Sequence, residues 1–546
     1  MSRLLRAAWI LTAAASFSPR LDVAAAAAAP ALVTTERDLL AALRAPTPHV
    51  RLSAALVLSA TLHLPPRATL IGSPGASLEL AAGAAGPVVR IAGAADVTLR
   101  DLRVAYPAGA SWRAQPAALL VEGGATRVAL AGLVVEGGVA LAGGVGITLS
   151  WSDISNARGA QNGTCVYVPG CGDSKSLTPC ALEIHDNEIH DCRYDGVSIY
   201  DGAAQGVLLG AQAGAPPSTP NGGCTVGVLV RNNYVRRVDE MGIRVATDAE
   251  CATVNNNVSY NRVAEWGQGS KAVGGDGADS GCLYVYGHWH APGNLFLANF
   301  CNSSANLTWG QNGAYLDDSA SGNAYVGNFF EGARDGVAVK LNGGQFNVVD
   351  SNVVYRGASL GAANCRGVRP PENYIYTCEN ANTGARWLKV LQAVDYLNPP
   401  WSLAFPWYRG FCSNVTAGPH DTPCRPPGAP AGYECASLSR GNVARNFATV
   451  AAVRNTTFLV PTSPGFPYLN WSSACPEFVV TGGFNNIDPA SQFAYASDDV
   501  FVDAAGGDLT LRADAPIFAD MPTFLRINFT AIGVGGAGPR KYTTES

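Results

Sequence analysis

The sequence has few charges, very little methionine and no block of basic residues. Charged residues make up 14% of the 546 residues, the formal net charge is −5, and 3 residues are methionine. A weakly charged, slightly acidic chain argues against nucleic acid or an anionic membrane as the main partner. Since 47% of the residues are hydrophobic, the chain is also too apolar to be disordered. The 61 glycines favour short strands and tight turns over long helices.

Beyond the N-terminus, the chain also lacks an uninterrupted apolar run that could span a membrane. The segment 128–149 is the best candidate, but it contains six glycines and Glu136. Its apolar residues alternate with others, which is typical of strands and not of a membrane helix. The C-terminus has no hydrophobic tail that would indicate a lipid anchor. We therefore expect no membrane span.

The N-terminus, by contrast, has the features of a secretory signal peptide. Arg3 and Arg6 precede the apolar run 7–17, and the small residues of 23–29 offer cleavage sites. The alternative is a first helix that is buried in the fold. A signal peptide over about residues 1–29 implies a secreted, extracellular protein.

The cysteines and glycosylation sequons fit this compartment. Fourteen cysteines lie between Cys165 and Cys475, and we expect most to form disulfides, locally Cys365–Cys378 and pairs among Cys412, Cys424 and Cys435. Eight N-x-S/T sequons make the chain a candidate glycoprotein. They stand at Asn162, Asn257, Asn302, Asn306, Asn414, Asn455, Asn470 and Asn528.

The most informative pattern is an internal repeat marked by asparagine. In seven places an asparagine follows an apolar residue by three positions, and two of the steps between these asparagines are 24 residues long. The seven asparagines are Asn187, Asn233, Asn257, Asn299, Asn328, Asn352 and Asn446. We expect them to form one column, with asparagine taking the left-handed bend between strands and its amide bonding to the next coil.

A second pattern gives the strands. Five segments begin with a glycine and continue with alternating apolar residues: GVSIYDG, GIRVATD, GCLYVYG, GAYLDD and GVAVKLN, starting at Gly196, Gly242, Gly281, Gly313 and Gly336. A step of 24 residues is too short for a strand–helix–strand crossover. Each step must instead hold two or three short strands that stack on the next coil. The pattern therefore predicts an all-β fold, a parallel β-helix or solenoid.

Composition divides the chain into four parts. Residues 1–29 form the signal peptide and 30–357 the β-helix, with an N-terminal cap that includes a helix near 36–43. Residues 358–440, rich in cysteine and proline, form a disulfide-rich C-terminal excursion. Residues 441–546 hold the last coils and a C-terminal cap.

Alternation then places two outward columns on one face of the stack. The first is predicted to contain Ser198, Arg244, Tyr284, Tyr315 and Ala338, and the second Tyr200, Ala246, Tyr286, Asp317 and Lys340. Tyrosine rings stack on sugar C–H surfaces, and charged groups bind hydroxyls, so this face suits a carbohydrate. Alternatively, these tyrosines serve only strand packing.

Carboxylates supply the candidate catalytic groups. Asp279 precedes one strand of this face, and Asp317 and Asp318 end the next. Asp317 and Asp318 could equally be turn residues. Asp239 and Glu240 fall at nearly the place of Asp279, one coil earlier.

Two histidines, His288 and His290, stand beside these carboxylates. Without a third fixed ligand they favour a substrate-lining role for His288 over a metal site. We therefore expect no metal and no other cofactor.

Three runs resemble a known group of secreted proteins: GADSGCLYVYGHWHAPGNLFLANF, NGAYLDDSASGNAYVGNFF and DGVAVKLNGGQFNVVDSNVVY. They resemble right-handed, single-stranded parallel β-helix proteins of the pectin-lyase-like superfamily, and most closely β-helical glycoside hydrolases that include an α-L-fucosidase and a xylanase. The resemblance implies that Asp279, Asp317 and Asp318 are the candidate acid, nucleophile or base. Asp279 matches the aspartate of a D-x-G-A-I-Y motif in that group, and Cys282 stands where this motif has alanine. The G-H-G and R-I-K motifs of polygalacturonases are missing.

These observations favour a secreted glycoside hydrolase that acts as a monomer on a polysaccharide. Arg244, Tyr284, Tyr286, His288, Tyr315 and Lys340 would bind the substrate. One alternative is a polysaccharide lyase or uronate epimerase, which needs cations to neutralise a uronate. The other is a non-catalytic β-helix protein that binds cell-wall or surface polysaccharide.

Overall fold

The structure is a computed structural model, and it describes most of the chain up to residue 364 and shorter parts beyond. The described residues are 29–107, 117–156, 163–200, 224–247, 252–268, 280–286, 290–302, 312–317, 320–331, 338–342, 346–356, 361–364, 391–407, 443–445, 447–450, 486–487, 492–495, 497–506 and 508–534.

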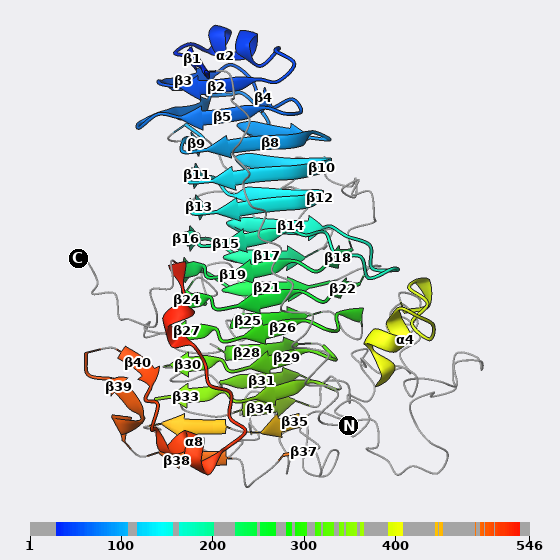
Figure 1. Ribbon diagram of the computed structural model, residues 1–546, viewed down its shortest axis with the longest axis vertical. Helices are drawn as coiled ribbons and strands as arrows, with labels where there is room; N and C mark the ends of the chain where they lie inside the picture. The colour runs from blue at the N-terminus through cyan, green and yellow to red at the C-terminus, as the bar shows by residue number, and fades with distance from the viewer. Residues whose placement is uncertain are drawn as a thin grey trace.

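Short parallel strands stack coil upon coil along the long axis of the molecule (Figure 1). In a typical coil the chain passes through three strands, which belong to what we call the first, second and third faces. β14 (Val166–Gly170), β15 (Glu183–His185) and β16 (Glu188–Cys192) make up one such coil. Each pairs in parallel with its equivalent in the next coil, β17 (Val197–Tyr200), β19 (Leu229–Arg231) and β20 (Tyr234–Val238). β10 (Leu119–Ala131) and β12 (Val139–Ser150) run around the corner between the first and second faces. The arrangement is mostly parallel β and compatible with the predicted β-helix.

The strands of each face have the following bounds. The first face also contains β4 (Leu62–His63), β7 (Val89–Ala92), β14 (Val166–Gly170), β17 (Val197–Tyr200), β21 (Ile243–Ala246), β25 (Gly281–Tyr286), β28 (Asn312–Asp317), β31 (Val339–Asn342) and β34 (Gly361–Asn364). The second also contains β1 (Ala31–Val33), β2 (His49–Leu52), β5 (Thr69–Gly72), β8 (Ala95–Arg100), β15 (Glu183–His185), β19 (Leu229–Arg231), β23 (Asn257–Ser259), β26 (Leu295–Leu297), β29 (Ala324–Val326), β32 (Val348–Asp350), β35 (Val443–Arg445) and β37 (Asn486–Ile487). The third contains β3 (Ala55–Leu58), β6 (Ser77–Leu80), β9 (Arg103–Ala105), β11 (Val134–Glu136), β13 (Asp153–Asn156), β16 (Glu188–Cys192), β20 (Tyr234–Val238), β24 (Arg262–Trp266), β27 (Phe300–Asn302), β30 (Phe329–Glu331), β33 (Val353–Tyr355), β36 (Phe447–Val450) and β38 (Gln492–Tyr495).

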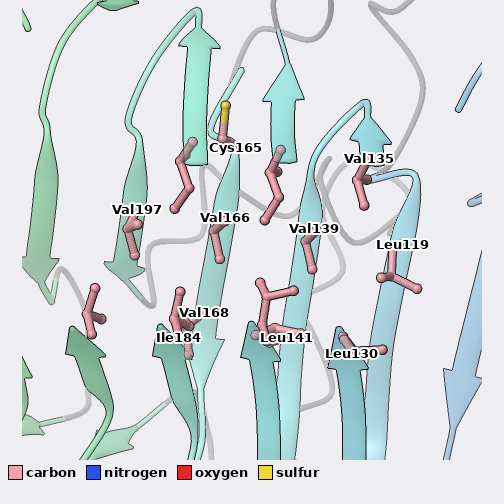
Figure 2. Close-up of a cluster of buried hydrophobic side chains, with 14 of the residues drawn as sticks. Leu119, Leu130, Val135, Val139, Leu141, Cys165, Val166, Val168, Ile184 and Val197 are labelled. Carbon is pink, nitrogen blue, oxygen red and sulfur yellow. The ribbon is translucent and has the colours of Figure 1, made fainter. Parts of the chain in front are cut away.

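The core is built from columns of aliphatic side chains that point into the coils. Val139, Val166 and Val197 are paired from coil to coil and are at most 1% exposed, as Figure 2 shows for this part of the stack. Because equivalent residues in paired strands lie about 4.8 Å apart, each methyl group packs directly on the one in the next coil. The period-2 alternation of the sequence thus produces a continuous apolar interior.

Asparagine forms a ladder at the corner before the third face. Each member lies directly before a third-face strand, is 0% exposed, and donates its side-chain amide to the Oδ1 atom of the next member at 2.9–3.1 Å. The members are Asn187, Asn233, Asn261, Asn299, Asn328 and Asn352. Asn257 was predicted to belong to this column, but it lies on β23, and Asn261 takes its place. The seventh predicted member, Asn446, lies outside the described residues.

The left-handed backbone at this corner belongs to the residue before each asparagine. Tyr260 and Ala298, for example, have φ values of 56° and 52°. The prediction that the ladder asparagine itself takes the bend was therefore wrong. The bend turns the chain so that the following asparagine points inward, where its amide satisfies buried backbone groups.

A second asparagine ladder, which the sequence pattern missed, lies before the second face. It connects Asn256, Asn294, Asn323 and Asn347, each directly before a second-face strand. Here, the residue three positions earlier is often small, such as Ala291 or Ala320, so the apolar marker is missing.

The two ends of the stack differ. At the N-terminal end, helix α2 (Glu36–Ala42) forms where the sequence predicts a helix, with Thr35 as its N-cap. Towards the other end, β35 pairs with β32 and continues the stack after the segment predicted to be an excursion. β34 falls inside that segment and still adds a strand to the first face, so the repeat extends further than predicted.

The C-terminal segment returns along the third face. The 3-10 helix η6 (Asp498–Val500), the antiparallel pair β39 (Phe501–Asp503) and β40 (Asp508–Leu511), helix α8 (Pro516–Asp520) and the 3-10 helix η7 (Phe529–Ala531) make up this segment. Its apolar side chains pack on Phe300, Phe329 and Tyr355, which point outward from β27, β30 and β33. Figure 1 shows the segment in orange and red beside these strands.

Among the disulfides whose two cysteines both lie in the described residues are Cys165–Cys192, Cys171–Cys180 and Cys282–Cys301, in the middle of the stack. Within the described part of the chain no cysteine is free. This is consistent with an extracellular protein. The predicted pairs Cys365–Cys378 and those among Cys412, Cys424 and Cys435 lie outside the described residues, as does most of the predicted signal peptide.

The described chain contains no helix of the length and apolarity needed to cross a membrane. The apolar segment 128–149 consists of strands.

Candidate functional site

Strand register brings most of the predicted site residues together on the first face. Arg244 on β21 pairs with Tyr284 on β25, and Tyr284 pairs with Tyr315 on β28. In the neighbouring outward column, Tyr286 pairs with Asp317. These side chains come from three successive coils, so they form one continuous patch.

The last coil of this patch is shifted from its predicted position. Lys340 was predicted to lie beside Asp317, but it pairs with Tyr315, where Ala338 was expected. Its Nζ atom lies 4.0 Å from the centroid of the Tyr315 ring, a cation–π contact. The segment GVAVKLN has apolar residues at every second position, so a shift of two residues keeps each side chain on its face and the pattern cannot detect it.

The centre of the patch is a hydrogen bond between a tyrosine and a carboxylate. Tyr284 Oη donates to Asp317 Oδ2 over 2.7 Å, and both residues are 4% exposed. Burial, reinforced by the nearby Asp317 charge, holds the pKa of Tyr284 well above its usual value. The phenol therefore keeps its proton and fixes the orientation of the Asp317 carboxylate. Tyr315 packs edge-on against Tyr284, with ring centroids 5.1 Å apart.

A buried arginine lies on the other side of Tyr284. The Arg244 guanidinium is 4.2 Å from the ring centroid of Tyr200 and 5.5 Å from that of Tyr284. Its Nη1 atom is 3.6 Å from Asp195 Oδ2. Burial opposes the charged form of Arg244, but the Asp195 carboxylate and the surrounding tyrosines together outweigh it and hold the pKa well above its usual value. Arg244 therefore remains a cation between two aromatic rings.

The chain matches no family model and no curated protein.

Two further carboxyls, Asp195 and Glu240, lie near Arg244. The sequence pattern pointed to Glu240 only in passing and to Asp195 not at all. The Gly196 N–H donates to the Met241 carbonyl and the Glu240 N–H to the Tyr194 carbonyl, both at 3.0 Å, so Asp195 and Glu240 lie on adjacent coils. Burial and the nearby Asp195 charge raise the pKa of Glu240 to about 7. Burial also raises the pKa of Asp195. Only their position just before the strand-opening Gly196 and Gly242 could have marked them.

Glu240 and Asp317 are too far apart to act on one glycosidic bond. Glu240 precedes Arg244 by four positions, and Asp317 follows Tyr315 by two, so they are offset by about 20 Å along the strands at about 3.3 Å per residue. A glycosidase needs two carboxyls within about 5–9.5 Å. Glu240 therefore does not form a glycosidase-type carboxyl pair with Asp317.

Three of the predicted site residues, Asp279, Asp318 and His288, lie outside the described residues. His290 is described, and it is fully buried. The described residues contain no group of three or more side chains that could hold a metal ion.

Proposed function

We propose that the protein is a secreted glycoside hydrolase that acts on a polysaccharide along the first face. We further propose that its stack is a right-handed parallel β-helix of the pectin-lyase-like type. The observation that carries the proposal is the buried hydrogen bond between Tyr284 and Asp317, inside a patch of tyrosines flanked by Arg244 and Lys340.

In this proposal Asp317 is the nucleophile or base. Tyr284 orients its carboxylate, and the partly exposed Tyr286 offers a ring surface to a sugar, whereas Tyr315 is fully buried beneath Lys340 and supports the patch from below. Asp279 or Asp318 would then donate a proton to the leaving oxygen. These are the two carboxyls that the motif resemblance implies.

The lyase alternative is less well supported by the described contacts. A lyase needs a cation that neutralises the substrate carboxylate, whereas Arg244 already faces Asp195 and Lys340 lies over the Tyr315 ring. A polysaccharide panel decides between the functions. Reducing ends without ultraviolet absorbance indicate a hydrolase, and unsaturated, absorbing products indicate a lyase. Binding without either product indicates a binding protein.

Asp317→Asn tests the assignment on any polysaccharide that the wild type cleaves. The substitution removes the charge with little change of shape, so we expect secretion and folding to survive while kcat falls at least 100-fold, about the scale of a catalytic group. Asp350→Asn is the matched control, because Asp350 also ends a strand and is 6% exposed but lies on the second face. Full activity of Asp317→Asn would remove Asp317 from the mechanism.

A further inference from the structure

Trp151 is an exposed aromatic residue at the corner between the second and third faces. It directly follows β12 and is 57% exposed. Among the large hydrophobic residues that the described chain exposes, it is the only aromatic one. A single exposed valine or leucine is ordinary, whereas an exposed tryptophan leaves a large apolar ring in water and is typical of binding surfaces.

The backbone of Trp151 is strained for a residue of this size. Its φ of 53° lies in the left-handed region, which glycine, asparagine and aspartate adopt far more readily than a bulky residue does. The same corner position in neighbouring coils is taken by such residues, Asp101, Gly132 and Asp186, with φ values of 59°, 62° and 55°. The corner therefore needs a small or polar residue, and the indole ring must be explained by something other than the fold.

A tyrosine in the same corner column shows what a packing role looks like. Tyr260 lies three coils further along and has a φ of 56°, but the C-terminal segment covers it. The Gly533 N–H donates to the Tyr260 carbonyl at 2.8 Å, and the Tyr260 side chain packs against the apolar cluster of that segment. Trp151, at 57% exposure, has no comparable cover.

An open groove of about 490 Å³ ends beside Trp151. Ser77 pairs with Arg103, and Arg103 with Val134, so the groove crosses three successive coils. Val134 pairs in turn with Asp153, two residues after Trp151, which places Trp151 on the next coil of the same column. The lining also includes Asp101 and Gly132.

The groove is accessible, and its surroundings are fully described. The Asp101 side chain is 56% exposed and Val134 is 40% exposed, so both face solvent. All residues that line the groove, and Trp151, belong to the described ranges 29–107 and 117–156.

The groove offers both polar and apolar contacts. Arg103 is held in place by carboxylates on both sides: its Nε atom donates to Glu136 Oε1 over 2.8 Å, its Nη2 atom donates to Glu136 Oε2 over 2.9 Å, and its Nη1 atom donates to Glu79. These three bonds leave part of the guanidinium, which carries five N–H groups, for a ligand. Asp101 supplies acceptor oxygens, and Val134 supplies an apolar wall.

We propose that Trp151 and this groove form a second carbohydrate-binding site, away from the first face. The inference rests on the proposed function, because it assumes that the ligand is a polysaccharide. A sugar has C–H surfaces that stack on an indole ring and hydroxyls that bond to Asp101 and Arg103. The column from Ser77 to Trp151 covers three coil steps, about 14 Å at about 4.8 Å per step. A narrow hollow of this length suits a chain of sugar rings better than the broad surface of a protein partner.

Tryptophan fluorescence of the secreted full-length protein tests the site. The probes are arabinan, galactomannan, xylan and polygalacturonate, and every variant carries Asp317→Asn so that the polymer is not consumed. We expect at least one probe to shift the emission to the blue, because stacking removes water from the indole. Adding Trp151→Asn should abolish this shift and weaken binding of the same probe about 3–10-fold.

Stability separates a lost contact from a damaged fold. Because asparagine tolerates left-handed backbone, the urea midpoint of Trp151→Asn should equal or exceed that of the parent protein. Tyr260→Asn is the matched control: it makes the same kind of change in the same corner column, and should lower the midpoint and leave binding unchanged. If Tyr260→Asn is not secreted, Val502→Ala, 56% exposed on β39, replaces it as the binding control.

Asp101→Asn is an independent test of the groove. It keeps the shape and the left-handed preference of the residue but replaces a charged acceptor with a neutral amide, so the same probe should bind more weakly. Binding that is unchanged in both Trp151→Asn and Asp101→Asn would reject the site and leave the proposed function in place.

The remaining outcomes separate this site from the proposed function. Weaker binding by Trp151→Asn, with no product released by the wild type, would support the site and reject the hydrolase. Failure of the protein to bind any of the four probes would reject the site together with a carbohydrate function on these substrates. A dimer in sedimentation that Trp151→Asn converts to a monomer would show that a second copy of the chain, and not a sugar, covers Trp151.

Discussion

At the scale of single residues, the ladder asparagines link each coil to the next through buried hydrogen bonds. Asn299 accepts bonds from the backbone and the side chain of Asn261 and donates to Asn328 and to the Val258 carbonyl. A buried corner between strands exposes backbone groups that no sheet partner satisfies. The ladder supplies those partners and fixes the register of each coil on the next.

Asn299→Ala should therefore destabilise the protein strongly. The backbone N–H of Asn261 and the Val258 carbonyl each lose a partner in a fully buried place, so we expect a loss of about 3 kcal/mol in the free energy of unfolding. Urea unfolding of the wild type and the variant measures it.

Asn257→Ala is the control for this prediction. Asn257 matches the same sequence marker but is only partly buried, and its Oδ1 atom makes no hydrogen bond. We expect a loss of less than about 1 kcal/mol. Equal losses in the two variants would mean that the ladder contributes nothing beyond an ordinary asparagine.

The pair Asn257 and Asn261 also shows what sequence can determine at this scale. Val254 precedes Asn257 by three positions and Val258 precedes Asn261 by the same number, so the marker fits both. Only the stacking of coils selects Asn261, because the next coil offers its hydrogen-bond partner Asn299 there.

At the scale of strands, alternation predicts which side chains point outward but not which coil positions face each other. The pairs Arg244–Tyr284 and Tyr286–Asp317 were correct. Lys340 was misplaced, because a shift of two residues preserves the alternation. The candidate site was thus predictable as a surface, whereas Asp195 was missed because a lone Asp-Gly reads as a turn.

The third face carries a charged network that should make stability depend on pH. His190 on β16 bonds to Asp153 Oδ1 at 2.7 Å and to Asp191 Oδ2 at 2.6 Å. The bond to Asp153 and then that to Asp191 raise the pKa of His190 against the effect of burial. A raised pKa in the folded state adds stability that is fully present below the unfolded pKa, about 6.5, and is lost as pH rises through the folded value.

We therefore expect the free energy of unfolding to fall as pH rises above about 6.5, with His190 contributing on the order of 1 kcal/mol. In His190→Gln the fall should be smaller. Glu240, whose pKa rises from 4.5 to about 7 on folding, adds a decline of the same sign between those two pH values, and His190→Gln keeps that decline. His63→Gln, which replaces an exposed histidine on β4, should follow the wild type. Parallel curves for the wild type and His190→Gln would contradict the assignment.

At the scale of the whole molecule, each coil contacts mainly its neighbours, and stability is therefore local. The parallel stack could be predicted because the asparagine marker and the alternating apolar segments recur from coil to coil. The return of the C-terminal segment onto the third face was not, because the contacts of Phe329 with Phe501 and Phe529 join positions far apart in sequence and carry no period. The docking of this segment depends on how its side chains pack against the third face, which no sequence period indicates.

Phe501→Ala should loosen this end of the molecule without affecting the other. Phe501 is 3% exposed, and its ring centroid lies 5.7 Å from that of Phe329 and 5.0 Å from that of Tyr355. Truncating such an aromatic residue costs about 3–5 kcal/mol, enough to undock a short segment. Hydrogen exchange should then rise in β27, β30 and β33, which the segment covers, and stay unchanged in β3 and β6 at the N-terminal end.

Val502→Ala controls for a substitution in the same strand, because Val502 is 56% exposed and should be neutral. If exchange in Phe501→Ala rose equally from β3 to β33, the stack would unfold as one cooperative unit, and the nearest-neighbour account of its stability would be wrong. If it rose nowhere, the C-terminal segment would be held by contacts other than its aromatic cluster. If hydrogen exchange rises only in β27, β30 and β33, then Phe501 anchors the C-terminal segment and the stability of the stack is local.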